Sequence, residues 1–331
     1  MKPSFLIGGI VFISLILRLV ILNSQMKNPS FEIQQDRYVD YAIALKEGTI
    51  NNADKFSQPE TRLFPGYPIL ILFVSKLVGN ETVAGVVISL VSSALAIFIF
   101  WDLIKSTFLT GVFAFFPPVW VVQSTKITTE PLTVLFLLLS VVLYKRQNFF
   151  LTGLLLGAAF NIRLISLCLL LAFFVISFRK KYYKSIMLML VGFIILFSML
   201  FVYNFSVFGY SGLFKQFQTY YSINNVSIGG IQIARDIIRT IDWKQYRILF
   251  SGLFYLAINL FALFQLYKHK NVSLLFQISF YWMLSSLIFV FFLGPTPLLE
   301  EFSRFSVPFF PALIIGLSAL IGGIKHKQKR I

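Results

Sequence analysis

Charged side chains are scarce in this 331-residue chain, because Asp, Glu, Lys and Arg together make up only 13% of it. A soluble domain carries about a quarter charged residues and needs them to cover its surface. The hydrophobic fraction is correspondingly high, at 57%. The shortage of charge excludes a soluble domain, and the excess of apolar residues indicates an integral membrane protein.

Cysteine is almost absent. The single one, Cys168, lies within an apolar run, so the chain has neither a disulfide framework nor a cysteine metal site. We interpret Cys168 as a small buried apolar side chain.

Acidic residues are also few beside basic ones, 13 against 29, which gives a formal net charge of +16. The basic residues form short clusters between apolar runs instead of one continuous face, so their number does not predict nucleic-acid binding. Such clusters orient a protein in the membrane and contact anionic lipid headgroups.

The apolar runs predict an all-α polytopic fold with about ten transmembrane helices in a single membrane domain covering residues 1–331. A bilayer core of about 30 Å requires roughly 20 apolar residues per helix. The runs lie at 4–23, 82–104, 107–123, 128–144, 149–162, 164–178, 185–207, 247–268, 272–293 and 304–323. We interpret the first as an uncleaved span, because it is longer than the core of a signal peptide.

A further run, 66–78, determines the topology. Its 13 residues are few for a span. If it does not cross the membrane, every dense basic cluster falls on one side, as the positive-inside rule requires. The sequence therefore predicts cytoplasmic N- and C-termini in a multi-pass protein of the cell membrane (the ER membrane in a eukaryote). Two external loops follow: 24–81, with an amphipathic helix at 36–47 and a re-entrant helix at 66–78, and 208–246.

Carboxylates concentrate on the predicted external side. Of the 13 acidic residues, only Asp102 is predicted to lie on the cytoplasmic side. Asp36 and Asp40 are four positions apart in the first loop, a spacing that places both on one face of a helix. An apolar stripe beside them (Tyr41, Ala44, Leu45) suits a membrane surface. An ordinary solvated helix is the alternative interpretation.

Three more charged sites are expected at the outer membrane boundary: Glu130, Arg163, and the pair Glu301 and Arg304. Charges at membrane depth usually face a polar cavity or a partner, although Glu130 and Arg304 are also compatible with snorkelling at helix ends. Arg163 separates two short apolar runs, which leaves room for a cavity. A guanidinium there suits a phosphate, which it binds through two parallel hydrogen bonds.

These residues together predict a reaction on a lipid phosphate whose tail stays in the bilayer. A carboxylate would act as the general base that deprotonates an acceptor hydroxyl, and the arginines would stabilise the departing phosphate.

The chain resembles the GT-C superfamily of polyprenyl-phosphate-sugar-dependent glycosyltransferases, especially its protein-mannosyltransferase-like and GPI-mannosyltransferase-like branches. The matching elements, in chain order, are Asp36-x-Tyr38 with Ala42 and Gly48; Phe64-Pro65-Gly66-Tyr67-Pro68; Thr129-Glu130; Gly153-x-x-x-Gly157 leading to Arg163; and Arg304 with Pro308 and Pro311. The spacing departs from the family pattern at one point, since Asp36 is two residues before Tyr38 and family members commonly place the aspartate three or four before the tyrosine.

The resemblance implies an inverting sugar transfer, of a mannose-like hexose or another sugar, from a polyprenyl-phosphate donor to a glycan, lipid or protein acceptor. Its implied residues are Asp36 as base with Asp40 as the alternative, Arg163 and Arg304 for the donor phosphate, and Glu130, Tyr38, Arg62 and Glu301 for orienting the site. No cofactor is expected, and the lack of Asp-x-Asp in the first loop gives no support to a divalent metal.

Two other functions are compatible with the sequence. A transporter or lipid-linked-sugar flippase would place charges deep within spans, for which Arg18 and Arg163 are the candidates. A non-catalytic scaffold of a glycan-assembly complex would explain the unusual aspartate spacing.

Overall fold

The computed structural model describes residues 3–28, 31–34, 36–50, 64–116, 118–210, 214, 246–293 and 298–321. Within these ranges the chain is helical and holds no named strand; one isolated bridge pairs Gln34 with Ile127. The predicted all-α class is confirmed. The longer helices are α1 (Pro3–Met26), α2 (Tyr38–Glu47), α3 (Gly66–Val78), α4 (Glu81–Ile104), α7 (Glu130–Lys145), α8 (Phe149–Phe160), α9 (Leu167–Arg179), α10 (Tyr183–Phe208), α13 (Tyr246–His269) and α14 (Leu274–Leu293). The shorter elements are α5 (Thr107–Phe115), α6 (Pro118–Gln123), η2 (Leu164–Ser166), α15 (Leu298–Ser306), η4 (Val307–Phe309), α16 (Phe310–Ser318) and η5 (Ala319–Ile321).

Four helices of the described chain are long and apolar enough to cross a membrane: Phe5–Met26, Glu81–Ile104, Tyr183–Phe208 and Leu274–Phe291. These four helices support the prediction of a membrane protein. The expected run 107–123 is not one helix, because it divides into α5 and α6, and Pro118 begins the second. Proline has no N–H for the helix ladder, so a new helix starts there more easily than an old one continues.

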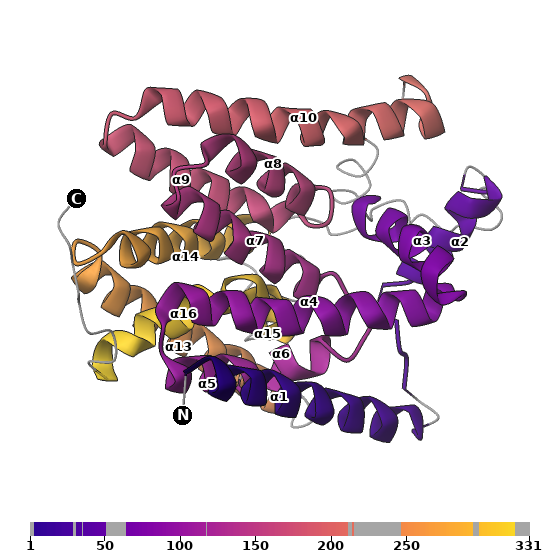
Figure 1. The fold of residues 1–331 in the computed structure, drawn as a ribbon, viewed down its shortest axis with the longest axis horizontal. Coiled ribbons are helices and arrows are strands. Elements are labelled where there is room, and N and C mark those ends of the chain that lie inside the picture. The colour runs from indigo at the N-terminus through magenta and orange to yellow at the C-terminus, as the bar shows by residue number, and fades with distance from the viewer. Residues whose placement is uncertain are drawn as a thin grey trace.

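α1, α4, α10 and α14 run roughly along the long axis of the molecule, and α7 crosses it obliquely (Figure 1). α1 and α4 lie side by side along one edge, α10 lies along the opposite edge, and α7, α8, α9 and α14 fill the space between. α2 and α3 gather at one end of this bundle, whereas the start of α1 and the last turn, η5, lie at the other end. α4 begins just after α3 and at the same end, so the chain turns back between α3 and α4.

The predicted helix 36–47 differs from α2 in two respects. α2 starts only at Tyr38, because the preceding residue, Arg37, adopts a left-handed conformation with φ 54° and cannot be part of the helix. Its apolar stripe does not lie on a membrane surface. Tyr41 is fully buried and belongs to a cluster that includes Tyr67 of α3 and Ala84 of α4. α2 is therefore packed on the protein.

Glycines bring α8 and α10 into backbone contact. A Cβ atom at Gly153 would overlap the carbonyl oxygen of Met189, and one at Gly192 would overlap that of Phe150. In a membrane no hydrophobic force drives helices together, so their association depends on close packing, which small residues permit. These contacts hold the first half of α8 against α10, and Gly157, where a Cβ atom would meet the Phe193 carbonyl oxygen, continues them toward Arg163.

Arg18 is completely buried within α1, in the part of the chain expected to span the membrane. Its Nε donates to Ser124 Oγ at 2.6 Å and its Nη1 donates to the carbonyl oxygen of Ala114 at 3.2 Å. It also donates to Ser14, one turn earlier in α1. Arg18 thus joins α1 to the segments around α5 and α6.

Candidate functional site

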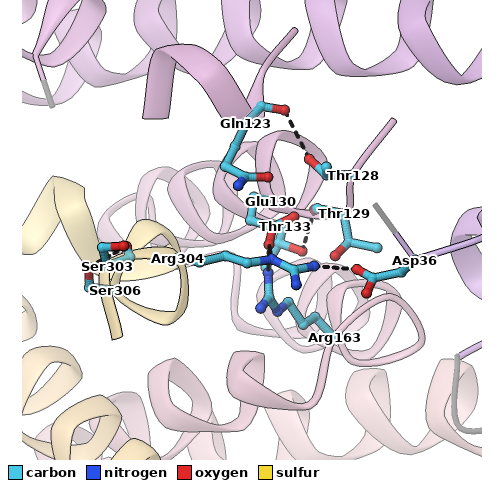
Figure 2. A network of polar contacts seen from close by, with 10 residues as sticks. All are labelled: Asp36, Gln123, Thr128, Thr129, Glu130, Thr133, Arg163, Ser303, Arg304 and Ser306. Atoms are coloured by element: carbon cyan, nitrogen blue, oxygen red, sulfur yellow. Dashed lines mark hydrogen bonds and ion pairs between the residues drawn. The ribbon is translucent and has the colours of Figure 1, made fainter. Parts of the chain in front are cut away.

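Four charged side chains that are far apart in the sequence meet in one cluster: Asp36, Glu130, Arg163 and Arg304 (Figure 2). They come from the segment before α2, the start of α7, the break between α8 and α9, and α15. Below, these four residues are called the charged cluster. All four were predicted from the sequence as site residues, but their mutual contacts were not.

Glu130 is the centre of the charged cluster. It is the first residue of α7 and has no exposed surface. The helix begins here because Pro131 suits the first turn, and the Thr133 hydroxyl donates to the carbonyl oxygen of Thr129 at 2.8 Å. The positive end of the α7 dipole also favours a carboxylate at this position.

Both arginines reach the same oxygen of Glu130. Arg304 Nε donates to Glu130 Oε1 at 2.7 Å. Arg163 Nη1 lies 2.5 Å from the same oxygen, as an ion pair without hydrogen-bond geometry. The second oxygen, Oε2, is buried and accepts no hydrogen bond from the described residues. A buried polar atom without a partner is unfavourable, so Oε2 is an acceptor that a ligand hydroxyl or a water would satisfy.

Arg163 occupies the break between two helices, as predicted. Its backbone is extended (φ −156°, ψ 128°) between α8 and η2, and its side chain is 14% exposed. Asn161 holds this turn: its Nδ2 donates to the carbonyl oxygens of Gly157, at 2.9 Å, and Leu196 of α10, at 2.7 Å. The Asn161 carbonyl oxygen accepts the Gly66 N–H of α3 at 2.9 Å. The position of Arg163 is thus fixed by three helices.

Arg304 lies on the short helix α15 and bridges two carboxylates. While Nε binds Glu130, Nη2 donates to Asp36 Oδ2. The Arg304 side chain is 15% exposed and that of Asp36 is 13% exposed. The next residue, Phe305, places its ring 5.4 Å from the Arg163 guanidinium carbon. α15 therefore contributes both a cation and an aromatic face to the charged cluster.

Asp40 does not belong to the charged cluster. Its carboxylate is 33% exposed and pairs with Arg37 Nε at 2.8 Å, and Gln34 Nε2 donates to it at 3.3 Å. The expectation that Asp36 and Asp40 share a helix face is wrong, because Asp36 precedes α2 and the left-handed Arg37 stands between them. The structure thereby separates the two candidate bases.

Tyr38 lies beside the charged cluster with its ring buried and edge-on to Tyr67, at a centroid distance of 5.1 Å. Burial raises the pKa of the Tyr38 phenol far above its usual value. The charges of Asp36 and Glu130 raise this pKa further, and the two arginines oppose them. Tyr38 is therefore a neutral phenol at physiological pH.

Two predicted orienting residues cannot be placed. Arg62 lies outside the described residues, and for Glu301 only the backbone, within α15, is described. Three neighbours of the charged cluster were not predicted: Gln123, Thr128 and Phe305. The Thr128 hydroxyl donates to the Gln123 carbonyl oxygen at 3.0 Å and closes the turn ahead of Glu130 (Figure 2). Thr128 and Phe305 lie close to Glu130 and Arg304 in the sequence, which could have indicated them, whereas Gln123 is farther from both and had no such signal.

The charged cluster contains two positive and two negative groups. Within the described part of the chain, no group of three His, Cys, Asp or Glu side chains is arranged to hold a metal ion. The expected absence of a cofactor stays a prediction. The chemistry that the residues support is the binding of an anion by guanidinium groups beside a carboxylate able to accept a proton.

No family model matches the chain, and no curated protein or solved structure is significantly similar to it. The functional interpretation therefore depends on the charged cluster and its surroundings.

Proposed function

We propose that this protein is a GT-C-like membrane glycosyltransferase, which transfers a sugar from a polyprenyl-phosphate donor to an acceptor hydroxyl with inversion at the anomeric carbon. The observation that carries the proposal is the meeting of Asp36 with Arg163 and Arg304 around Glu130. A base and two phosphate-binding cations within one cluster are the groups that this reaction requires.

The membrane arrangement in this proposal has about ten spans, both termini in the cytoplasm, and α2 and α3 outside or at the outer surface. It is supported by the position of α3, which lies with α2 at one end of the bundle and is followed by α4 starting at that same end (Figure 1). In this arrangement α3 does not cross the membrane, so the chain is on the same side of the membrane before and after it. The charged cluster then faces the extracytoplasmic side of the cell membrane.

The donor phosphate would bind to Arg163 and Arg304. Guanidinium groups match phosphate oxygens in geometry and remain charged at any physiological pH. Both side chains are mostly buried, at 14% and 15% exposure, so they act in an environment less polar than water. A small exposed fraction leaves each of them accessible to a headgroup, and the lipid tail would remain between the apolar helices.

Asp36 would act as the base. Its carboxylate takes the proton of the acceptor hydroxyl while the hydroxyl oxygen forms a bond to the anomeric carbon. The bond between that carbon and the phosphate oxygen breaks, and its electron pair leaves with the phosphate, whose added charge the arginines stabilise. One displacement from the opposite face inverts the anomeric centre.

Glu130 would position both arginines. A buried carboxylate between two guanidinium groups holds them side by side, which suits recognition of one phosphate by both. The acceptor would be a glycan, lipid or protein, and membrane lipids would surround the apolar faces of α1 and α10.

The test is sugar transfer by the purified protein in liposomes, with a polyprenyl-phosphate-linked sugar as donor. Asp36→Asn should reduce turnover by about 100-fold or more, in the range known for general base catalysis. Asp40→Asn is the matched control, since that carboxylate pairs only with neighbours outside the charged cluster in the described chain, and it should retain turnover. Full activity in both variants would show that neither aspartate is the base.

A transporter of lipid-linked sugars is the second candidate, because Arg18 is a fully buried charge in a membrane-spanning helix. The same liposomes distinguish it: movement of the lipid-linked sugar between leaflets without transfer to any acceptor would replace the glycosyltransferase proposal.

A further inference from the structure

Arg304, which is proposed to bind the donor phosphate, is already bonded to Asp36, the proposed base. Arg304 donates through Nη2 to Asp36 and through Nε to Glu130. These two nitrogens form one edge of the guanidinium, the edge that receives an oxyanion through two parallel hydrogen bonds. A phosphate approaching this edge therefore meets two carboxylates.

We infer that the donor phosphate and Asp36 compete for Arg304, so that donor binding releases the Asp36 carboxylate to the acceptor hydroxyl. The inference rests on the proposed function and adds an order to it. Arg304 then couples donor binding to catalysis, because its guanidinium exchanges the Asp36 carboxylate for the donor phosphate.

Charge explains why the two anions compete. The charged cluster has two cations and two carboxylates, so a phosphate entering it adds an uncompensated negative charge next to Asp36. Like charges a few ångströms apart repel strongly where water is largely excluded. Removal of the Asp36 charge should therefore strengthen the binding of phosphate.

Burial explains why Asp36 is displaced and Glu130 is not. Glu130 has no exposed surface, begins α7 and is paired with both arginines. Asp36 is 13% exposed and lies before α2, separated from the helix by the left-handed residue Arg37. Movement of Asp36 needs a change in a short segment, whereas movement of Glu130 would require α7 to shift.

The consequence is an ordered reaction. Without donor, Arg304 holds the carboxylate of Asp36, so an acceptor or a water molecule arriving first meets an engaged base. With donor bound, the same carboxylate is available beside the anomeric carbon.

The experiment measures binding of polyprenyl phosphate, without sugar, to the full chain in lipid nanodiscs. Asp36→Asn removes the charge and keeps the shape, and it should bind polyprenyl phosphate about 5- to 10-fold more tightly than the wild type, a normal size for coupling between two sites. Asp36→Ala should change affinity in the same direction. Asp40→Asn should leave the affinity unchanged, and Arg304→Met should weaken it.

Polyprenol, which has no phosphate, is the control ligand, and the aspartate variants should not change its binding. If the wild type binds polyprenyl phosphate and neither Asp36 variant binds it more tightly, the competition is refuted and the proposed function stands. If the wild type binds polyprenyl phosphate no better than polyprenol, the proposed function itself fails.

Discussion

Arg304 joins Asp36 to Glu130, although the first of these carboxylates is 268 positions away along the chain. This single side chain connects the first loop, the start of α7 and the short helix α15. The charged cluster therefore forms only when the two ends of the sequence have folded against the middle.

Loss of the central carboxylate should destabilise the protein. Glu130→Gln leaves the charges of Arg163 and Arg304 less compensated in a buried place, and breaking a buried ion pair in this way removes about 3 kcal/mol of stability. Thermal unfolding in detergent measures the effect. Glu81→Gln is the control, because its partner Lys46 is mostly exposed and such a surface pair contributes little. Equal melting temperatures for the two variants would contradict a central role for Glu130.

Lysine should not replace the arginines. Arg163→Lys and Arg304→Lys keep the positive charge but lose the paired hydrogen bonds, so we expect KM for the lipid-phosphate donor to rise about 10-fold. Steady-state kinetics over a range of donor concentrations measures this change. Arg179→Lys, at the end of α9 where the arginine contacts Tyr281, is the control and should leave KM unchanged. An unchanged KM in both cluster variants would remove the arginines from the donor site.

The contact between α8 and α10 should not tolerate a methyl group. Gly153→Ala forces the two helices apart, since its Cβ would overlap the Met189 carbonyl oxygen, and overpacking of this kind costs about 1–3 kcal/mol. Gly111→Ala in α5 is the matched control, because a Cβ there meets nothing within 4 Å. Unfolding temperatures of the two variants should differ, with Gly153→Ala the lower. Similar values would mean that the helices adjust without strain.

The Tyr38 phenol should not titrate in the working range of the protein. Burial raises its pKa above the unfolded value of about 10, so its contribution to stability is complete below that pH and is lost as the pH rises further. Tyr38→Phe should therefore leave the shape of the activity profile unchanged from about pH 6 to 9 and should lessen the loss of stability in alkali. A change in the alkaline limb of the activity profile below pH 9 would show a titrating phenol at the site.

The two ends of the bundle should react with a membrane-impermeant thiol reagent from opposite sides. Cys168→Ser gives a background without cysteine, and its buried hydroxyl can donate to the Ser285 carbonyl oxygen, as the Cys168 thiol does. In intact cells, Glu47→Cys at the exposed end of α2 should be labelled from outside, and Lys180→Cys, exposed after α9, only after the membrane is opened. Labelling of both positions in intact cells would refute the topology.

The charged residues of the site could be predicted because charge is rare in this sequence. Glu130, Arg163 and Arg304 also stand at or near the edges of apolar runs, and Asp36 lies in the first predicted external loop. The start of α2 could not be predicted, because nothing in the residue type of Arg37 indicates a left-handed conformation. The placement of Asp40 outside the charged cluster follows from that one residue. Likewise the division of the run 107–123 follows from Pro118, whose effect on the helix outweighs the continuous apolar pattern.

The features of the site that the sequence could not predict depend on contacts between elements that are far apart in the chain. The sequence places Arg304 and Phe305 on the last predicted span, but only the packing of α15 brings Phe305 to Arg163. The same holds for Arg18, whose hydrogen bonds to Ser124 and Ala114 depend on how α1 lies against α5 and α6. Such partners are set by tertiary packing and have no local signal.

Each member of the charged cluster stands at or near the end of its helix or just outside one: Glu130 opens α7, Arg163 follows α8, Asp36 precedes α2 and Arg304 lies in the last turn of α15. Apart from Arg18 in α1, the interiors of the long helices place no charged side chain in a polar network among the described residues, and we expect them to be constrained mainly by volume and packing. In a saturation mutagenesis experiment, apolar exchanges at lipid-facing positions of α1 and α10 would be accepted freely, while tolerance would fall sharply at these few helix boundaries.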